Sequence, residues 1–218
     1  MLVAKGIHKN YGDLHVLNGV DVKINSGEVV SIVGSSGAGK STLLHILGTL
    51  DHADKGEVMI GETLITGLKG DKLAEFRNRE IGFIFQFHNL LPEFTAEENI
   101  MIPGLIANRP INEIRKRAGQ LAERLGISSR LGHKPSELSG GEQQRVAVAR
   151  ALVNDPKIIF ADEPSGNLDS KSAEALHKLF FELRKEFGQS FVIVTHNQEL
   201  AQMADRTLVM QDGKIIGQ

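Results

Sequence analysis

Apolar and polar residues alternate along much of the first third of the chain. From residue 20 to 25 the order is Val, Asp, Val, Lys, Ile, Asn, the pattern of a strand with one face buried and the other in water. Residues 57–65 and 207–216 are predicted to form hairpins, because each run turns at a short polar pair, Gly61-Glu62 and Asp212-Gly213. We therefore expect the opening third to consist of strands.

Three other runs are apolar at almost every residue. They lie at 29–33, 157–161 and 191–194. A strand that is apolar on both faces is typical of the centre of a parallel sheet covered by helices. These runs predict an α/β core.

The middle of the chain changes to helical spacing. Apolar side chains recur at positions 114, 118, 121, 122 and 125, and residues 173–187 carry a second stripe of this kind. Both stripes are predicted to be ordinary helices that face the core. We expect a single domain over 1–218, with a core and a β subdomain at about 1–87 and 155–218 and a helical subdomain inserted at about 88–154.

Composition narrows the possible partners. The 218 residues are 41% hydrophobic, enough for a core, and the formal net charge is only −2 with acids and bases interspersed, so nucleic acid is not expected as a partner. There are no cysteines, and the first residues lack the apolar segment of a secretory signal. No run reaches the roughly 18 apolar residues that cross a bilayer. Any role at a membrane is therefore expected to depend on a partner.

A phosphate-binding loop follows the first apolar run. Its residues are Gly34, Ser35, Ser36, Gly37, Ala38, Gly39, Lys40 and Ser41, and a helical pattern begins at Thr42. The glycines let backbone N–H groups point at phosphate oxygens, and the helix N-terminus adds a positive dipole. Lys40 is expected to bind the β- and γ-phosphates of ATP, and Ser41 to offer a hydroxyl to Mg²⁺. The whole motif is present, and it lies between an expected strand and an expected helix. A glycine-rich turn that matches by chance is therefore a far weaker interpretation.

Two carboxylates follow the second apolar run. Asp162 and Glu163 stand at the carboxyl end of that expected strand, where open α/β sheets bind ligands, and Pro164 ends it. Asp162 is expected to hold Mg²⁺, and Glu163 to accept a proton from the attacking water or to orient it. An acidic turn at the surface is the alternative, and the phosphate loop makes it the weaker one.

Ser139, Gly140 and Gly141 form a second loop in front of a helix. By itself this is a plain helix cap, but the free N–H groups at such a helix start also bind phosphate. One nucleotide needs only one such loop. Two in a chain of this length suggest that each serves one face of an ATP held between two copies of the protein.

Along essentially its whole length, the chain resembles the nucleotide-binding subunit of an ATP-binding cassette (ABC) transporter. Six motifs occur in that family's order: the Walker A loop at 34–42, Gln86 after an expected strand at 81–85, the signature at 138–143, the Walker B run at 158–162 with Glu163, the loop at 165–169, and His196. The resemblance implies a P-loop NTPase (RecA-like) core with an N-terminal antiparallel β subdomain and an inserted helical subdomain. It also implies an ATP hydrolase that dimerises and works with integral membrane subunits.

The resemblance assigns roles to individual side chains. Tyr11 matches the aromatic residue that stacks on adenine, although it would otherwise be a surface tyrosine at a strand end. Gln86 is placed beside Mg²⁺ and the attacking water, and His196 at the γ-phosphate. His45 and His177 are expected to be ordinary helix residues.

Two assignments concern the neighbouring subunit. Ser139 and Gly141 would contact the γ-phosphate held by the other copy. Asp169 would belong to a loop that crosses the dimer interface; without the resemblance it would be the N-cap of the following helix.

Within the family, residues 82–99 and 163–169 resemble the ATPases of lipoprotein-releasing systems, with Ser165 where Thr is usual. Apolar side chains at 87, 90, 91 and 94 are expected either to receive a cytoplasmic helix of a membrane partner or simply to pack the subdomain. We therefore expect a peripheral protein on the cytoplasmic face of the inner membrane that powers lipoprotein release.

Other classes of ABC protein are alternatives. One is the ATPase of a macrolide or peptide exporter, in which the domain is commonly fused to its membrane segment. Another is an ATPase that regulates cell-wall hydrolysis at division. A non-transport ABC ATPase of DNA repair or translation ranks last, because the chain has no long coiled-coil insertion and no second cassette.

Overall fold

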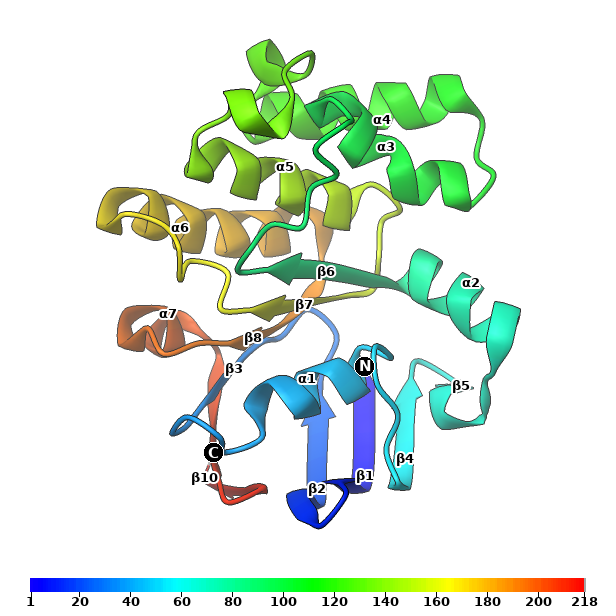
Figure 1. The fold of residues 1–218 in the computed structure, drawn as a ribbon, viewed down its shortest axis with the longest axis vertical. Coiled ribbons are helices and arrows are strands. Elements are labelled where there is room, and N and C mark those ends of the chain that lie inside the picture. Colours follow the sequence, from blue (N-terminus) through cyan, green and yellow to red (C-terminus); the bar gives the residue numbers. More distant parts are fainter. Residues whose placement is uncertain (218) are drawn as a thin grey trace.

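The computed structural model describes residues 1–217, and its larger sheet lies at the centre of the molecule (Figure 1). The strand order is β10-β9-β3-β8-β7-β6, and all neighbours are parallel except β9 and β10. The strands are β3 (Val29–Val33), β6 (Ile81–Phe85), β7 (Ile158–Asp162), β8 (Ser190–Val194), β9 (Arg206–Gln211) and β10 (Lys214–Gly217). The three apolar runs of the sequence are therefore adjacent central strands.

A smaller antiparallel sheet has the order β2-β1-β4-β5. Its strands are β1 (Leu2–Tyr11), β2 (Leu14–Ile24), β4 (Lys55–Ile60) and β5 (Thr63–Leu64). In β2, Val20, Val22 and Ile24 are buried while Asp21 and Lys23 are exposed, which confirms the predicted alternation. Both predicted hairpins are also present, as β4–β5 and β9–β10.

Helices cover the larger sheet on one face, and the smaller sheet and α1 cover the other (Figure 1). The α-helices of residues 1–217 are α1 (Lys40–Leu47), α2 (Gly70–Glu80), α3 (Ala96–Ile106), α4 (Ile111–Arg124), α5 (Gly140–Leu152), α6 (Ser170–Phe187) and α7 (Gln198–Met203). Short 3₁₀ turns lie at Ile65–Gly67, Ser128–Arg130 and Pro135–Glu137. The two predicted helical stripes correspond to α4 and α6.

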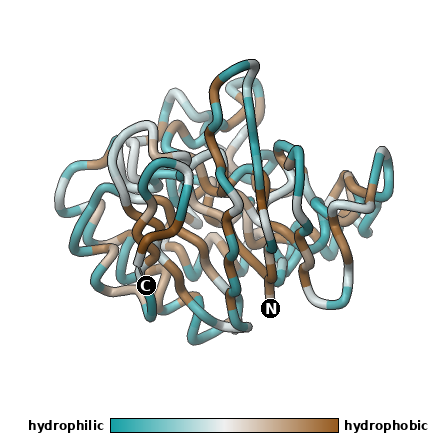
Figure 2. Tube along the Cα trace, turned by 90° about the horizontal axis from the view of Figure 1, so that it is seen from below, coloured by the Kyte–Doolittle hydropathy of each residue, from teal (hydrophilic) through white to brown (hydrophobic). Residues whose placement is uncertain are grey.

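Each central strand is buried on both faces. In β7, Ile159 belongs to the core under the helices and Phe160 to the core against the smaller sheet. Hydrophobic segments accordingly run through the interior of the trace, and hydrophilic ones form the turns around it (Figure 2). The predicted fold class is confirmed: a mixed α/β core with an antiparallel β sheet beside it, and helices α3 to α5 inserted between β6 and β7.

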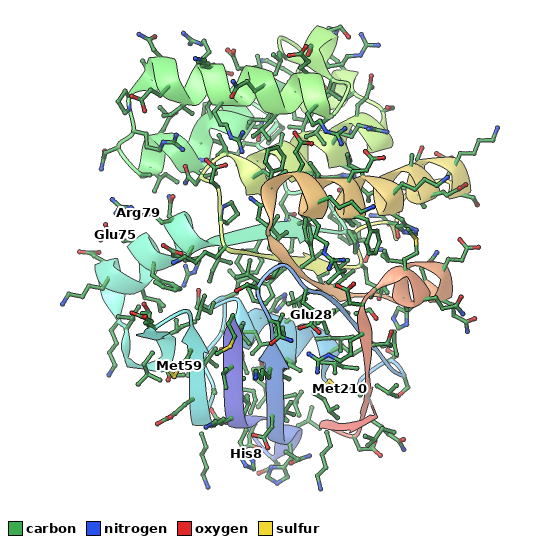
Figure 3. All side chains as sticks on the ribbon, turned by 180° about the vertical axis from the view of Figure 1, so that it is seen from behind. His8, Glu28, Met59, Glu75, Arg79 and Met210 are labelled. Atoms are coloured by element: carbon green, nitrogen blue, oxygen red, sulfur yellow. The ribbon has the colours of Figure 1, made fainter. Side chains whose placement is uncertain are left out.

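Residues 70–80 form α2, a helix that the sequence pattern did not predict. None of these residues is fully buried, and Leu73 and Phe76, which pack against the core, are too few to form a recognisable apolar stripe. An exposed ion pair one helical turn apart, Glu75 with Arg79 at 3.1 Å, marks its solvent face (Figure 3). Within residues 1–217, no helix has the length and apolar character needed to span a membrane.

Candidate functional site

The carboxyl ends of the five parallel strands of the larger sheet lie at the same edge. In the register of that sheet, Phe85 lies opposite Asp162, and Asp162 lies opposite Val194. Gln86, Glu163 and His196 follow these positions by one or two residues. The sheet thus brings together three predicted site residues that are far apart in the chain.

The loop between β3 and α1 needs glycine at two points. Gly34 has φ 154°, and a Cβ built there would lie 2.1 Å from the carbonyl oxygen of Met210. Gly39, at φ 98°, would place a Cβ 2.9 Å from the carbonyl oxygen of Val16. Backbone conformation and close packing both exclude larger residues at these points. The predicted loop is therefore fixed against β2 and β9.

Lys40 lies at the first residue of α1 and is buried. Its Nζ donates to the carbonyl oxygens of Gly34, at 3.0 Å, and Ser35, at 2.8 Å. A buried ammonium group that is held by carbonyl oxygens is a strong local positive charge. Such a charge at a helix N-terminus favours an anion.

Ser41 and Asp162 place two oxygen atoms that could bind a metal ion side by side. The Ser41 hydroxyl donates to Asp162 Oδ1 at 3.1 Å. His45, one turn further along α1, brings its Nε2 to 3.6 Å from Asp162 Oδ2. His45 therefore lies closer to the site than an ordinary helix residue would.

Glu163 and His196 face each other across β7 and β8. The His196 N–H donates to Glu163 Oε2 at 3.2 Å, and His196 Nε2 lies 3.2 Å from Oε1. Burial raises the pKa of Glu163, and the nearby Asp162 adds to this rise while His196 opposes it. Glu163 also has a left-handed backbone, φ 45°, which is uncommon for a non-glycine residue and is held here by the surrounding turn.

Gln86 lies between the strand edge and the loop after Glu163. Its Nε2 donates to Asn167 Oδ1, and Asn167 Nδ2 donates back to the Gln86 carbonyl oxygen, both at 3.1 Å. A Cβ on Gly166 would lie 2.8 Å from the Gln86 side chain. The amide is therefore fixed by the loop that also carries Asp169, which caps α6 by accepting the N–H groups of Lys171 and Ser172.

Tyr11 is 52% exposed at the end of β1. Its hydroxyl donates to Asp51 Oδ2 at 2.6 Å, and Lys9 Nζ lies 5.0 Å from the centre of its ring. Although burial alone would raise the pKa of Asp51, the hydrogen bonds from Tyr11 and Lys9 lower it to about 2. The ring is thus held in place with its apolar body accessible.

Ser139, Gly140 and Gly141 form the start of α5. Ser139 and Glu142 make a capping box: the Glu142 N–H donates to Ser139 Oγ at 3.3 Å, and the Ser139 N–H donates to Glu142 Oε2 at 2.8 Å. Cβ atoms on the two glycines would first meet Leu168 and Ser172, at 3.9 and 3.5 Å. The structure does not bring this loop to the Lys40 loop: α5 lies on the helical side of the larger sheet and α1 on the opposite side (Figure 1).

Two buried polar side chains near the site were not predicted to belong to it: Gln144 was not singled out, and His177 was expected to be an ordinary helix residue. Gln144 of α5 donates to the carbonyl oxygen of Pro164 at 2.6 Å, and the buried His177 is hydrogen-bonded to Ser165 Oγ at 3.0 Å. Neither residue had a signal of its own, because each lies on a helix with an ordinary apolar pattern. Only the packing of α5 and α6 on the loop after Glu163 reveals them.

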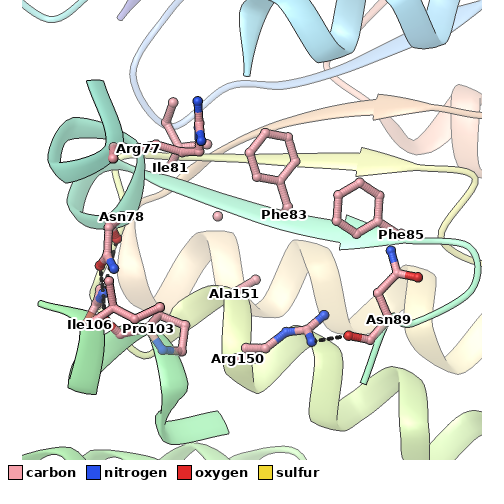
Figure 4. Close-up of a pocket in the computed structure, with 13 residues that line it drawn as sticks. Arg77, Asn78, Ile81, Phe83, Phe85, Asn89, Pro103, Ile106, Arg150 and Ala151 are labelled. Carbon is pink, nitrogen blue, oxygen red and sulfur yellow. Dashed lines mark hydrogen bonds between the residues drawn. The ribbon is translucent and has the colours of Figure 1, made fainter. Parts of the chain in front are cut away.

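A groove of about 450 Å³ opens beside β6, between α2, α3 and α5 (Figure 4). Phe83, Phe85 and Ile106 line it, and Arg150 donates to the carbonyl oxygens of His88 and Asn89, both at 2.6 Å. These two residues have left-handed backbones, φ 51° and 50°. Arg150 therefore fixes the turn that follows Gln86.

This turn and the segment after it, residues 87–94, expose apolar side chains. Phe87 is 74% exposed, and Leu91 and Phe94 are also exposed, whereas Leu90 packs against the core. The buried Asn99 fixes the segment by accepting the Leu91 N–H at 2.8 Å and donating to three carbonyl oxygens, those of Leu91, Phe94 and Thr95. An exposed apolar surface on so well-fixed a segment is typical of an interaction site.

Comparison with known proteins agrees with this arrangement. The model of the ABC transporter family matches residues 17–166. The chain belongs to the ABC transporter family. It has the P-loop core of an ABC ATPase, and the predicted family, fold and class of enzyme are thereby confirmed.

Similar proteins cover the whole chain. It is 60% identical over 216 residues to a lipoprotein-releasing system ATP-binding protein LolD of Cytophaga hutchinsonii, with 99% of each chain covered. It is also 60% identical, over the full length of both chains, to the LolD of Porphyromonas gingivalis.

Among solved structures, a dimeric post-hydrolysis state of the ATP-binding cassette MJ0796 bound to ADP and Pi is similar to this chain. The TM-score is 0.91 at 40% identity, with 100% of this chain and 97% of that chain covered.

Proposed function

We propose that this ABC ATPase powers the release of lipoproteins from the inner membrane by integral membrane partners. The relatives named LolD support this function, because they are 60% identical to the chain along its entire length. The corresponding location is the cytoplasmic face of the membrane, where the protein would be held by its partners. The geometry of the strand edge supports the chemistry.

In this proposal the chain's own residues divide the work of ATP hydrolysis. The N–H groups of residues 34–42 and the Lys40 ammonium bind the phosphates. Glu163 orients the attacking water and accepts its proton, for which a pKa above the ordinary value of glutamate is suited. His196 and Gln86 complete the site. His196 donates to the γ-phosphate, and Gln86 lies beside the water and the metal. Tyr11 offers its accessible ring to adenine.

Mg²⁺ fits the residues that the structure places together. Ser41 Oγ and Asp162 Oδ1 are 3.1 Å apart, and hydroxyl and carboxylate oxygens are ligands that Mg²⁺ prefers, together with phosphate oxygens. The Gln86 amide is the third candidate ligand. When bound, the ion would neutralise part of the phosphate charge.

A second copy of the chain would complete the site. The start of α5 is a capped helix with backbone donors, but in its own chain it lies away from the Lys40 loop. We propose that Ser139, Gly140 and Gly141 bind the γ-phosphate held by the neighbouring copy. The dimeric cassette MJ0796 supports this arrangement.

The groove beside β6 is the proposed contact with the membrane partner. It is bordered by α3 and α5 of the helical segment, for which we propose the limits 88–154, and by the exposed Phe87 segment. A short cytoplasmic helix with an apolar face fits such a groove. A partner seated there would contact the turn that follows Gln86 and so couple to the ATP site.

One observation carries the proposal most directly: the sheet register that brings Gln86, Glu163 and His196 to one edge beside the Lys40 loop. Its test uses Glu163→Gln, Ser139→Arg and the double variant. We expect Glu163→Gln to bind ATP like the wild type, to lose turnover by about 10²-fold or more, and to accumulate as an ATP-bound dimer in gel filtration. Ser139→Arg should bind ATP without hydrolysing it, and the double variant should remain monomeric. Normal hydrolysis by Glu163→Gln, or dimers of the double variant, would contradict the proposal.

The cargo is tested in cells. Depleting the protein should leave lipoproteins in the inner-membrane fraction, and expression of the wild type, but not of Glu163→Gln, should return them to their normal fraction. Normal lipoprotein sorting during depletion would exclude this cargo while leaving the ATPase assignment intact.

A further inference from the structure

Gln144 is a fully buried glutamine in the second turn of α5. Its Nε2 donates to the Pro164 carbonyl oxygen at 2.6 Å, while its Oε1 is buried and has no hydrogen-bond partner within residues 1–217. A buried, unpaired amide oxygen is destabilising, and an apolar side chain of the same size would avoid that cost. Stability alone therefore does not explain a glutamine here.

The acceptor of this hydrogen bond is the residue after Glu163. Pro164 has no N–H, so its carbonyl is the only backbone group through which it can be held by a hydrogen bond. On its other side the turn is tied to the sheet, because the Glu163 N–H donates to the Val194 carbonyl oxygen at 2.9 Å. The Gly166 N–H closes the turn on the Glu163 carbonyl at 3.0 Å. Gln144 thus anchors the left-handed Glu163 from the side of α5.

The same helix begins with Ser139–Gly141. Gln144 lies five positions after Ser139, which is about one and a half turns of a rigid helix. The capping box fixes the first turn, so that a shift of the helix start also moves Gln144. The Gln144 side chain and the helix start at Ser139–Gly141 are therefore expected to move together.

We propose that Gln144 is a positioning residue that aligns Glu163 in one copy when the start of α5 engages the nucleotide of the other copy. The inference rests on the proposed nucleotide-sandwich dimer and adds an order of events to it. Glu163 becomes effective only after its own chain has contributed Ser139–Gly141 to the neighbour. Hydrolysis before the dimer has closed is thereby suppressed.

The test removes the side-chain donor of Gln144 and keeps the volume of the side chain. Gln144→Met has an unbranched side chain of similar length that cannot donate to Pro164. We expect ATP affinity within about twofold of the wild type, turnover lowered by about tenfold or more, and an ATP-bound dimer that accumulates as in Glu163→Gln. A purely structural role would instead reduce dimer formation together with turnover. That result, or turnover within about twofold of the wild type, would overturn the inference.

Gln189→Met is the matched control. Gln189 is also buried and also has an unpaired Oε1 within residues 1–217, but it precedes β8, at the end of the strands opposite to the site. This variant should show wild-type turnover and no trapped dimer.

A second variant keeps the test informative if Gln144→Met does not fold. Gln144→Glu retains the shape and can donate to Pro164 only when its carboxyl is protonated. Its turnover relative to the wild type should therefore fall as the pH is raised from 6 to 8, or stay low throughout. Turnover equal to the wild type over that range would overturn the inference.

Wild type and Glu163→Gln are measured alongside. If the wild type does not hydrolyse ATP, or Glu163→Gln forms no ATP-bound dimer, the proposed function itself fails. If both behave as expected and Gln144→Met matches the wild type, only the role of Gln144 fails.

Discussion

The two loops that offer backbone donors to phosphate differ in how much of a site each chain supplies. Around the Lys40 loop, the same chain provides a buried ammonium group, the Ser41–Asp162 pair and the Glu163–His196 pair. Around the start of α5 it provides the Ser139–Glu142 cap, an arginine partner for Glu142, and two glycines that pack near α6. The first loop is a nearly complete site, whereas the second is a rigid surface that needs a ligand from elsewhere.

The two loops have similar local chemistry but different consequences for folding and function. Packing within the chain fixes Gly34 and Gly39 of the first loop, because β9 and β2 leave no space for a Cβ at these two positions. The glycines of the second loop have more space, so their restriction is expected to come from the nucleotide of the other copy.

The largest expected effect separates the glycines of the two loops. Gly34→Ala places a Cβ 2.1 Å from a carbonyl oxygen in a left-handed backbone, and we expect it to lower the free energy of unfolding by more than about 3 kcal/mol in urea. In Gly140→Ala the nearest atom is 3.9 Å away, so stability should stay within about 1 kcal/mol of the wild type. Turnover of Gly140→Ala should nevertheless fall, because the added methyl group projects from the surface offered to the neighbour. Equal destabilisation by both substitutions would contradict the proposed difference in packing between the two loops.

A smaller effect separates capping from catalysis. Ser139 and Thr95 both begin a helix with a capping box, with Glu142 and Glu98 respectively. Ser139→Ala and Thr95→Ala should each cost about 1 kcal/mol in thermal or urea unfolding. Only Ser139→Ala should also lower turnover, by about tenfold, because only its hydroxyl is expected to reach a γ-phosphate. Equal turnover of the two variants would assign Ser139 a capping role alone.

The smallest effect concerns the acid that fixes the second loop. Arg130 donates to Glu142 at 2.6 Å, and with the N–H and hydroxyl of Ser139 it lowers the pKa of Glu142 to about 2. Because the folded pKa is depressed, this contribution is present above the unfolded value of about 4.3 and is lost as the pH falls toward 2. Solvent screening limits it to roughly 1 kcal/mol.

Glu142→Gln keeps the capping-box geometry and removes this charge. Its deficit in unfolding free energy should be present at pH 7 and should shrink between pH 5 and pH 2. Glu98→Gln is the control: within residues 1–217 no arginine hydrogen-bonds to Glu98, so its pH dependence should be weaker. A deficit of Glu142→Gln that does not change with pH would contradict the assignment.

Much of the site could be predicted because its residues stand in short motifs that combine a strand end, a loop and a helix start. Gln86 follows β6 directly, and Asp162 ends β7 as expected. The residues that hold these motifs could not be predicted in the same way. Gln144, His177 and Asn99 each stand beside other polar residues in their helices, so nothing local marks them as buried. Their partners are backbone or hydroxyl groups of loops that only the fold brings to them.

The sequence by itself determined the central apolar strands, the two hairpins, the helical stripes, the phosphate loop, the carboxylate pair and the family, because periodicity and local spacing encode them. It missed α2, since the two apolar residues that pack against the core are too few to form a recognisable stripe. Only the tertiary structure decided that the start of α5 lies away from the Lys40 loop of its own chain and that Gln144 reaches Pro164. These relations depend on how helices pack across a sheet, and no local pattern of residues records that packing.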